Sequence, residues 1–294
     1  MTPRQHVSLV ITDLDNTLFD WLKIWYDSFK ALLDSVIEIS GISADILIPE
    51  VKKIHERHGT AEYAFLLEEL PSLRRGESTE LVIAQYTPAI DAFRNARRAA
   101  MKLYPGVRAT LDELKKCGCL LVAYTESMGF YSNYRMRHLD LDLVFDFIYS
   151  PPDHGLPQGL TPEAIRYYPA DAYKLRATQH RHTPAGEVKP NPALLTDIIR
   201  ELGGEKDRTI YIGDSKMKDV VMAQDAHVTD VWAKYGDTRG RPEYELLKKV
   251  THWPEALVQQ EKQSVLVKAS THILKDSFSD LLNKFTFVPF VKSS

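Results

Sequence analysis

The chain has 294 residues, of which 44% are hydrophobic and 26% are charged, with a formal net charge of −3 at pH 7. This composition is ordinary for a globular protein and leaves room for one large domain or two of moderate size. The charge gives no sign of a global basic surface, so we expect neither a nucleic-acid partner nor an acidic membrane surface as a partner.

No segment is typical of a signal peptide or of a membrane-spanning helix. The apolar stretch near the N-terminus is short and runs into Asp13 without a small-residue cleavage site. No run approaches the roughly 18 apolar residues that indicate a transmembrane helix. The two cysteines, Cys117 and Cys119, are too close together to close a useful disulfide loop, and we expect both to be reduced. We therefore expect a cytoplasmic protein without membrane attachment.

The first predicted element is a buried strand over residues 7–12, which are mostly apolar. From Trp21 onward the apolar residues recur at steps of three and four, which indicates amphipathic helices. Start and stop signals divide this region into four predicted helices, over residues 21–41, 43–59, 60–70 and 78–100, the last with Pro88 as a kink or break. Residues from about 20 to 100 are therefore predicted to be all-helical.

After this block, predicted strands alternate with predicted helices. The strands cover residues 119–125, 145–150, 209–214 and 229–235, and the helices cover residues 107–116, 129–139, 192–202 and 217–225. Such alternation is typical of an α/β fold with a doubly wound parallel sheet and right-handed crossovers. A last segment, residues 272–282, is expected to return to the sheet edge as strand and helix.

The helical block is then an insertion after the first strand of the sheet. We expect an α/β core made of residues 1–18 and 104–294, with an all-helical cap domain over residues 19–103. Residues 151–188, rich in Pro, His and Tyr, are predicted to be a long insertion loop within the core. Residues 241–268 are predicted to be a further helical excursion, whose role the sequence leaves open.

Polar residues gather near the ends of the predicted strands. They are Asp13, Asp15 and Thr17 in DLDNT, Thr125 in AYTES, Lys189 in GEVKPNP, and Asp214 and Asp219 in GDSKMKD. Ligands of open α/β sheets bind beyond the carboxyl ends of the strands, so these side chains should converge. Two carboxylates about 4 Å apart repel by roughly 4 kcal/mol at an effective dielectric near 20, and a divalent cation is the usual countercharge. The set therefore predicts a site for a metal ion and a phosphoryl group.

In this order the motifs resemble those of the haloacid dehalogenase superfamily, in particular its phosphatases with a helical C1 cap inserted just after the first motif. That family has Asp-x-Asp-x-Thr, then a Thr or Ser ending an apolar strand, then a Lys, then Gly-Asp followed by another Asp. All four are matched here, and the stretches LYPGVRATLDEL and GEVKPNPALL are also similar. The resemblance covers residues 7 to about 238 and the segment near 272–282.

The resemblance implies roles for the three main carboxylates. Asp13 is expected to be the nucleophile, which forms an aspartyl-phosphate, and also a ligand of Mg²⁺. Asp15 is expected to protonate the leaving alkoxide and later to deprotonate water, while its backbone carbonyl binds the same metal ion. Asp214 is expected to be the third metal ligand.

The remaining residues are expected to bind phosphate or to support the site. Thr125 and Lys189 are expected to contact phosphoryl oxygens, Asp219 to orient the metal shell, and Thr17 to support the turn after the strand. Glu126 departs from the family, in which many members carry Asn at this position. We expect its backbone N–H to face the phosphate and its side chain to turn away or to meet a basic partner.

The expected function is Mg²⁺-dependent hydrolysis of a small soluble phosphomonoester, with a cap that excludes bulk water. The acidic Asp15 favours phosphate esters over carbon–halogen bonds, because an alkoxide needs a proton to leave whereas a halide does not. Alternatives stay open within this class: a phosphomutase, or a phosphonate hydrolase with a Schiff-base lysine from the cap, such as Lys23, Lys30, Lys52 or Lys53. A phospho-accepting signalling module is the alternative from another class. The sequence leaves the identity of the phosphomonoester and the oligomeric state open.

Overall fold

The protein is described by a computed structural model that covers residues 4–74, 76–153, 168–253 and 269–293. Its centre is a seven-stranded sheet in which all neighbouring strands are parallel, in the order β5-β4-β3-β2-β6-β7-β8. The strands are β2 (Leu9–Thr12), β3 (Leu120–Tyr124), β4 (Phe147–Ser150), β5 (Gln179–His182), β6 (Thr209–Gly213), β7 (Thr229–Ala233) and β8 (His272–Leu274). The predicted α/β class with a parallel sheet is confirmed.

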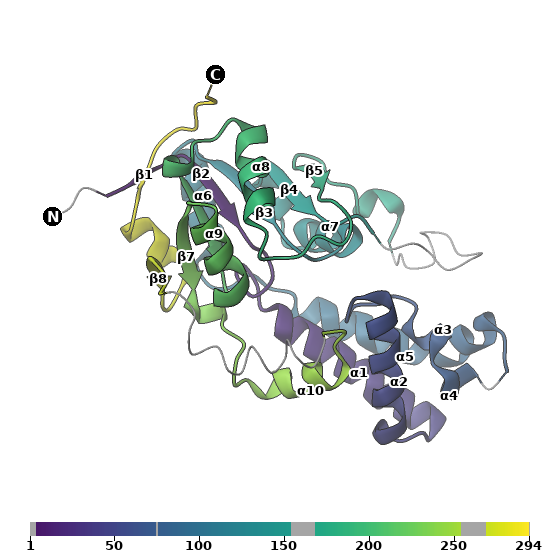
Figure 1. The fold of residues 1–294 in the computed structure, drawn as a ribbon. Coiled ribbons are helices and arrows are strands. Elements are labelled where there is room, and N and C mark those ends of the chain that lie inside the picture. Colours follow the sequence, from purple (N-terminus) through teal and green to yellow (C-terminus); the bar gives the residue numbers. More distant parts are fainter. Residues whose placement is uncertain (1–3, 75, 154–167, 254–268, 294) are drawn as a thin grey trace.

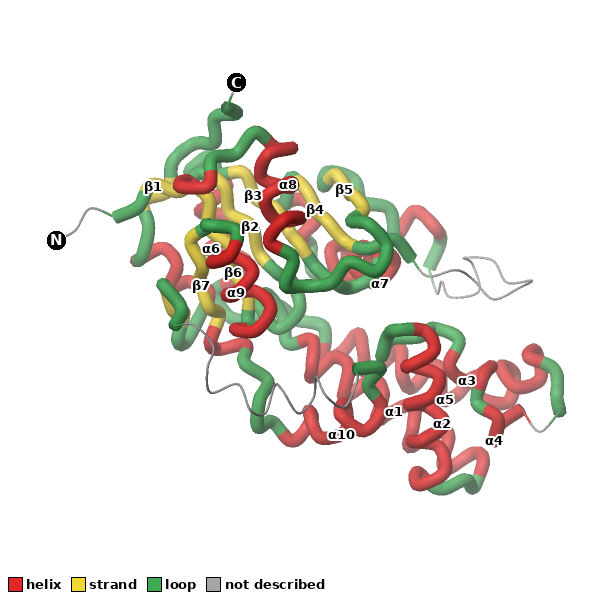
Figure 2. The backbone as a smooth tube through the Cα atoms, viewed as in Figure 1, coloured by secondary structure: helices red, strands yellow, loops and turns green. Residues whose placement is uncertain are grey.

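Helices cover both faces of this sheet (Figure 2). Alternate residues of a strand point to opposite faces, and both faces are apolar because both are covered. Val10 of β2 packs in a cluster with α6 (Val107–Lys116) and α7 (Gly129–His138), whereas Ile11 packs in another with α8 (Pro192–Leu202) and α9 (Val221–Asp225). The sheet is therefore held rigidly between two layers of helix.

Three parts of the core differ from the sequence prediction. Residues 151–188 are not one loop, since β5 lies within them and adds a strand to the sheet; residues 154–167 lie outside the described residues. The predicted helix over residues 217–225 begins as a π-helical turn, η5 (Lys216–Val220), before α9. A small second sheet, unforeseen, pairs β1 (His6–Val7) with β9 (Thr286–Phe287). Residues 272–282 contain the expected strand and helix, β8 and the 3₁₀ helix η7 (Phe278–Asn283).

The inserted block is helical, as predicted. Its helices are α1 (Trp21–Ser40), α2 (Ala44–His58), α3 (Leu66–Glu69), α4 (Pro71–Arg74) and α5 (Thr79–Ala100). Local signals set the ends of α1: the Asp20 side chain accepts a hydrogen bond from Lys23 N, and Gly41 adopts a left-handed conformation that ends the helix. Helix α5 continues through Pro88.

The predicted helix over residues 60–70 is wrong in its first half. The chain has no helix between Gly59 and Leu66, and α3 is only one turn long before Pro71 starts α4. The hydroxyl of Thr60 accepts a hydrogen bond from Glu62 N, which stabilises a turn in place of a helix. We call residues 60–65 the cap loop.

A segment from far along the chain completes the helical block. Helix α10 (Pro242–Val250) packs against α1 and α2, where Tyr244 and Leu247 join their apolar cluster (Figure 1, yellow-green beside purple). His55 of α2 contacts the carbonyl of Val250 at 2.7 Å. We refer to α1–α5 with the cap loop and α10 as the cap. The expected helical excursion at 241–268 is thus present over Pro242–Val250, and residues 254–268 lie outside the described part.

The two crossings between sheet and inserted block lie side by side. Phe19 bridges to Leu103, and Tyr104 N donates a hydrogen bond to Leu18 O at 2.8 Å. This geometry supports domain boundaries at these crossings. We propose that residues 19–103 are one domain and residues 1–18 and 104–294 the other, with α10 of the second domain packed onto the first as part of the cap. Within the described residues, none of the helices combines the length and apolar character needed to cross a membrane.

Candidate active site

The candidate site lies at the carboxyl ends of three adjacent strands. Asp13 follows β2, Thr125 follows β3 and Asp214 follows β6, and β2 pairs with both of its neighbours. From β2 the chain builds the sheet outward through β3, β4 and β5, and then returns to place β6 on the other side of β2. This reversal is the kind of topological switch point at which α/β sheets bind ligands.

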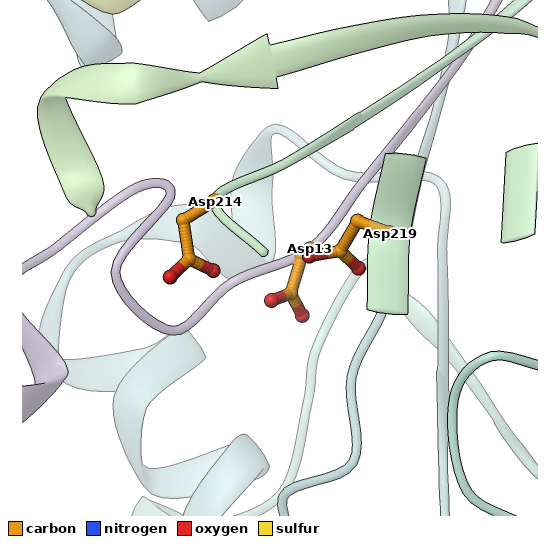
Figure 3. A group of neighbouring side chains, drawn as sticks. All are labelled: Asp13, Asp214 and Asp219. Carbon is orange, nitrogen blue, oxygen red and sulfur yellow. The ribbon is translucent and has the colours of Figure 1, made fainter. Parts of the chain in front are cut away.

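Three carboxylates gather there, from Asp13, Asp214 and Asp219 of η5. Each offers one oxygen atom, and these three atoms lie within 4.8 Å of one another. Figure 3 shows the three side chains. Burial, Asp219 and Asp15 raise the pKa of Asp13 to about 7 against the effect of Lys189. Burial, Asp219 and Asp13 likewise raise the pKa of Asp214 well above its usual value. The protein alone thus leaves this cluster with excess negative charge.

The cluster fits a hard divalent cation such as Mg²⁺. Carboxylate oxygens are the ligands that Mg²⁺ prefers, and a cation would favour the ionised carboxylates that burial disfavours. The Asp219 carboxylate stands in this group, whereas the side chain of Asp15 turns elsewhere. Gly213 is required beside Asp219, because a Cβ at this position would collide with the Asp219 carboxyl group.

Lys189 is a buried cation of the site. Its Nζ lies 2.8 Å from Asp13 Oδ1 and 3.1 Å from Asp219 Oδ1. Burial alone would lower the pKa of Lys189, but Asp13 and Asp219 raise it well above its usual value. Asp219 is further held by the Tyr211 hydroxyl at 3.0 Å and by Ser215 N at 3.0 Å. With all these partners, the Asp219 carboxylate is fixed in place beside Lys189.

Asp15 faces a different set of partners. The hydroxyl of Ser127 donates a hydrogen bond to Asp15 Oδ2 at 2.6 Å, and Arg135 Nη1 lies 3.4 Å from Asp15 Oδ1. Arg135 also donates to Ser127 Oγ at 2.9 Å and forms an ion pair with Glu62 of the cap loop. Burial and Glu62 raise the pKa of Asp15 against the effect of Arg135. A carboxyl group whose pKa is raised in this way suits general acid catalysis.

Thr125 contacts Asp15 and Ser127, and Glu126 contacts Lys189 and Lys218. The buried hydroxyl of Thr125 accepts a hydrogen bond from Ser127 N at 3.0 Å and lies 3.4 Å from Asp15 Oδ2. Glu126 Oε2 accepts from Lys218 Nζ at 2.7 Å, which confirms the expected basic partner. Its other oxygen accepts from Lys189 N at 3.0 Å, so Glu126 also fixes the backbone at Lys189.

Thr17 lies in the turn that follows Asp15. Its backbone N donates to Leu14 O at 3.2 Å, and its carbonyl accepts from the Tyr235 hydroxyl at 2.6 Å. Its own hydroxyl is buried and has no hydrogen-bond partner among the described residues. Its contacts therefore support the turn through the backbone.

Four residues of the site were not predicted: Glu62, Ser127, Arg135 and Lys218. Glu62 and Arg135 are far apart in sequence and meet only because the cap lies over the core. The one signal for Ser127 was its place two residues after Thr125, and nothing in the sequence separates Arg135 from the neighbouring Arg137. Most of the site residues, though not Thr17, Thr125 and Arg135, border a cavity of about 270 Å³ between core and cap, which Trp21 and Glu62 close from the cap side.

Comparison with known proteins identifies a family and several relatives. The haloacid dehalogenase-like hydrolase family matches residues 7–227 of this chain. The chain is 22% identical over 234 residues to a glyceraldehyde 3-phosphate phosphatase of Methanopyrus kandleri, covering 78% of this chain and 85% of that protein. It is 25% identical over 243 residues to a phosphoglycolate phosphatase of Pseudomonas fluorescens, covering 82% and 74% respectively.

Solved structures show the same fold. A 2-haloacid dehalogenase from Pseudomonas syringae pv. Tomato DC3000 aligns with a TM-score of 0.51 and 19% identity, covering 78% of this chain and 86% of that one. A candidate β-phosphoglucomutase from Thermotoga maritima aligns with a TM-score of 0.53 and 18% identity, covering 94% and 99%. The motifs, the fold and the match over most of the sequence lead to one conclusion. This chain belongs to the haloacid dehalogenase-like hydrolase family.

Proposed function

We propose that this protein is a Mg²⁺-dependent phosphatase that hydrolyses a small phosphomonoester through an aspartyl-phosphate on Asp13. One observation carries the proposal: Asp13 lies 2.8 Å from the buried ammonium group of Lys189 and also forms a carboxylate cluster with Asp214 and Asp219. The two curated relatives described above are both named as phosphatases of small phosphorylated compounds, which supports the same class of substrate.

Asp13 is the proposed nucleophile. One of its carboxylate oxygens attacks phosphorus while the bond from phosphorus to the leaving oxygen breaks, so the phosphoryl group is transferred to Asp13. Asp13, Asp214 and the backbone carbonyl of Asp15 would hold Mg²⁺, with Asp219 in support; when bound, the ion supplies positive charge that keeps Asp13 ionised and offsets the charge of the phosphoryl oxygens. Lys189 adds a fixed positive charge next to the attacking group.

Asp15 is the proposed acid and base. Ser127 and Arg135 hold its carboxyl group in place. In the first half-reaction it gives a proton to the leaving oxygen, so the product leaves as an alcohol. In the second half-reaction it takes a proton from the water that attacks the phosphorus of the aspartyl-phosphate, which releases phosphate and restores Asp13.

Thr125 and Lys189 are the proposed phosphate-binding side chains, with the backbone N–H of Glu126 beside them. The hydroxyl of Thr125 is buried at the end of β3, one strand away from Asp13. Because the Glu126 carboxylate is engaged by Lys218, its negative charge is compensated and does not repel an incoming phosphate. This pairing removes the difficulty that a Glu poses where many relatives carry Asn.

The alternative reactions receive no specific support. A phosphonate hydrolase needs a cap lysine in the site, but the lysines that line the described part of the cavity are Lys189 and Lys218, both from the core. Lys23 and Lys30 of the cap instead form ion pairs along α1 with Asp27 and Asp34. A phosphomutase would use the same residues, and differs in whether water or a sugar hydroxyl accepts the phosphoryl group.

A panel of phosphorylated metabolites, assayed with Mg²⁺ and with chelator, tests the proposal. We expect metal-dependent release of inorganic phosphate from at least one monoester, and its loss by several orders of magnitude in Asp13→Asn, because nucleophile and metal ligand are lost together. Release of phosphate that continues in Asp13→Asn would refute the proposed role of Asp13. An isomerised phosphate ester without free phosphate would indicate a mutase.

A further inference from the structure

A second cleft lies in the cap, directly beside the active-site cavity. It encloses about 210 Å³ between α1, α5 and the cap loop, and α7 of the core closes one side. Most of its wall is apolar, and aromatic rings are prominent in it: Trp25, Phe29, Tyr63, Phe93, Phe130 and Tyr131. Concave apolar surfaces of this kind are typical of small-molecule sites.

The two cavities share part of their walls. Ala61, Glu62 and Tyr131 line both, so single side chains separate the active site from the cleft. Glu62 is held in this wall by its ion pair with Arg135 and by the indole N–H of Trp21, which donates at 3.2 Å. The wall therefore belongs to the same group of contacts that surrounds Asp15.

The proposed role of Asp15 places the leaving group of the substrate on the side of the active site that faces the cap cleft. On the proposed function, the Asp15 carboxyl group gives its proton to the leaving oxygen, so that oxygen must lie against Asp15. Asp15 is joined through Arg135 to Glu62 in the shared wall. The remainder of the leaving group would then extend away from the metal site toward Glu62, in the wall that the active-site cavity shares with the cleft.

We propose that the substrate of this enzyme is a phosphomonoester whose alcohol carries an apolar body, a single ring or a short branched alkyl group, and that this body binds in the cap cleft. The inference rests on the proposed phosphatase function and adds the substrate class. A cavity of about 150 Å³ lined by Leu, Ile and Phe is large enough to admit benzene. The cleft is larger, so it accommodates a ring together with a short linker.

The polar groups of the cleft favour an uncharged body. Two arginines, Arg94 and Arg97, and two glutamates, Glu62 and Glu68, line it, so their formal charges balance. The guanidinium of Arg97 lies 4.6 Å from the ring centre of Tyr134, and within the described residues its buried Nε–H has no hydrogen-bond partner. A single acceptor on the substrate, such as an ether or hydroxyl oxygen, would satisfy this donor.

The test compares simple monoesters on the wild-type enzyme. We measure kcat/KM with Mg²⁺ for methyl, isobutyl, benzyl and 2-phenylethyl phosphate, whose alcohols are similarly poor leaving groups. We expect the best of the three larger esters to exceed methyl phosphate at least about tenfold, the size of effect that a filled apolar pocket gives. Equal values, or a preference for methyl phosphate, would overturn the inference while leaving the phosphatase function intact.

A failure of the proposed function has a different signature, since no monoester in this series or in the metabolite panel would then release phosphate. Variants locate the effect if turnover is present. Ile90→Trp fills the cleft, and Gln85→Trp adds the same group to an exposed position of α5 outside it. We expect the ratio of benzyl to methyl turnover to fall at least about fivefold in Ile90→Trp and to stay unchanged in Gln85→Trp.

An unchanged ratio in a folded Ile90→Trp protein would contradict binding in the cleft. Circular dichroism melting establishes that the variant is folded. If Ile90→Trp is not folded, the comparison of the esters on the wild-type enzyme alone tests the proposal, because that comparison needs no substitution.

Discussion

The ammonium group of Lys189 lies 2.8 Å from a carboxylate oxygen of Asp13, and both residues as a whole are less than a tenth exposed. Asp219 is the second partner of the same ammonium group. One positive charge thus serves two buried carboxylates, a third stands beside them, and the site needs a further cation to approach neutrality. This relationship leads to predictions about stability as well as catalysis.

Replacing Lys189 by Met should destabilise the metal-free protein by about 3–5 kcal/mol, because Asp13 and Asp219 are left buried without their countercharge. Urea unfolding measures the change. Lys218→Met is the matched control, since its pair with Glu126 is partly exposed and should cost less. A smaller loss of unfolding free energy in Lys189→Met than in Lys218→Met would contradict the burial of the Lys189 ion pairs.

Mg²⁺ should stabilise the folded protein. Binding to the native state alone contributes about 2.7 kcal/mol when the ion is present at a hundred times its Kd. We expect a Tm that rises with Mg²⁺ concentration in the wild type and responds little in Asp214→Asn, which lacks one carboxylate of the cluster. Asp276→Asn, at an exposed position, should behave as the wild type does. A Mg²⁺ response preserved in Asp214→Asn would place the ion elsewhere.

Arg135 should be essential for stability although it is not part of the metal cluster. It is 2% exposed and pairs with both Asp15 and Glu62, so Arg135→Met leaves two carboxylates without their partner. We expect a loss of about 3–5 kcal/mol in the free energy of unfolding. Arg108→Met removes a surface pair with Asp112 and should cost no more than about 1 kcal/mol. Equal losses in the two variants would show that the buried pairs contribute no more than the exposed one.

The contact between α2 and α10 should make stability depend on pH. Burial lowers the pKa of His55 to about 4 from its ordinary value of 6.5, and its neutral ring donates to Val250 O. Between pH 6.5 and 4 the unfolded chain binds a proton that the folded protein does not. Stability should therefore fall as the pH falls through this window, by up to about 1.4 kcal/mol per pH unit from this residue.

Chemical denaturation at several pH values, compared with His55→Asn, isolates this contribution. We expect the difference in unfolding free energy between wild type and variant to be constant above pH 7 and to narrow below pH 6.5. If the unfolding free energies of wild type and His55→Asn stay parallel down to pH 4.5, His55 is not the source of the pH dependence.

The main features of the site could be predicted because parallel strands carry their carboxyl ends to one edge. Once β2, β3 and β6 were recognised from their apolar runs, the convergence of Asp13, Thr125 and Asp214 followed from topology alone. Lys189 and Asp219 were expected near the strand ends, but neither follows a strand directly in the structure. The family motifs supplied their expected roles. The basic partner expected for Glu126 followed from charge, since a carboxylate beside a phosphate site needs compensation.

Other features depend on contacts that no local pattern contains. Strand β5 has the sequence QHRH, which shows no apolar alternation because it lies at the edge of the sheet. The cap loop has the apolar residues of a helix, but they pack into the cap from irregular backbone. Helix α10 and Arg135 meet partners more than 70 residues away in sequence, and such distances require the folded structure.

The most direct measurement of the central claim is the chemical identity of the phosphorylated residue. The enzyme is mixed with 4-nitrophenyl phosphate and Mg²⁺, quenched in acid within the first turnover and reduced with borohydride, which converts an acyl phosphate to an alcohol. Peptide mass spectrometry then locates the modified residue. Our account predicts homoserine at position 13 and unmodified Asp15, Asp214 and Asp219. Turnover with modification at another residue, or turnover undiminished in Asp13→Asn, would contradict it.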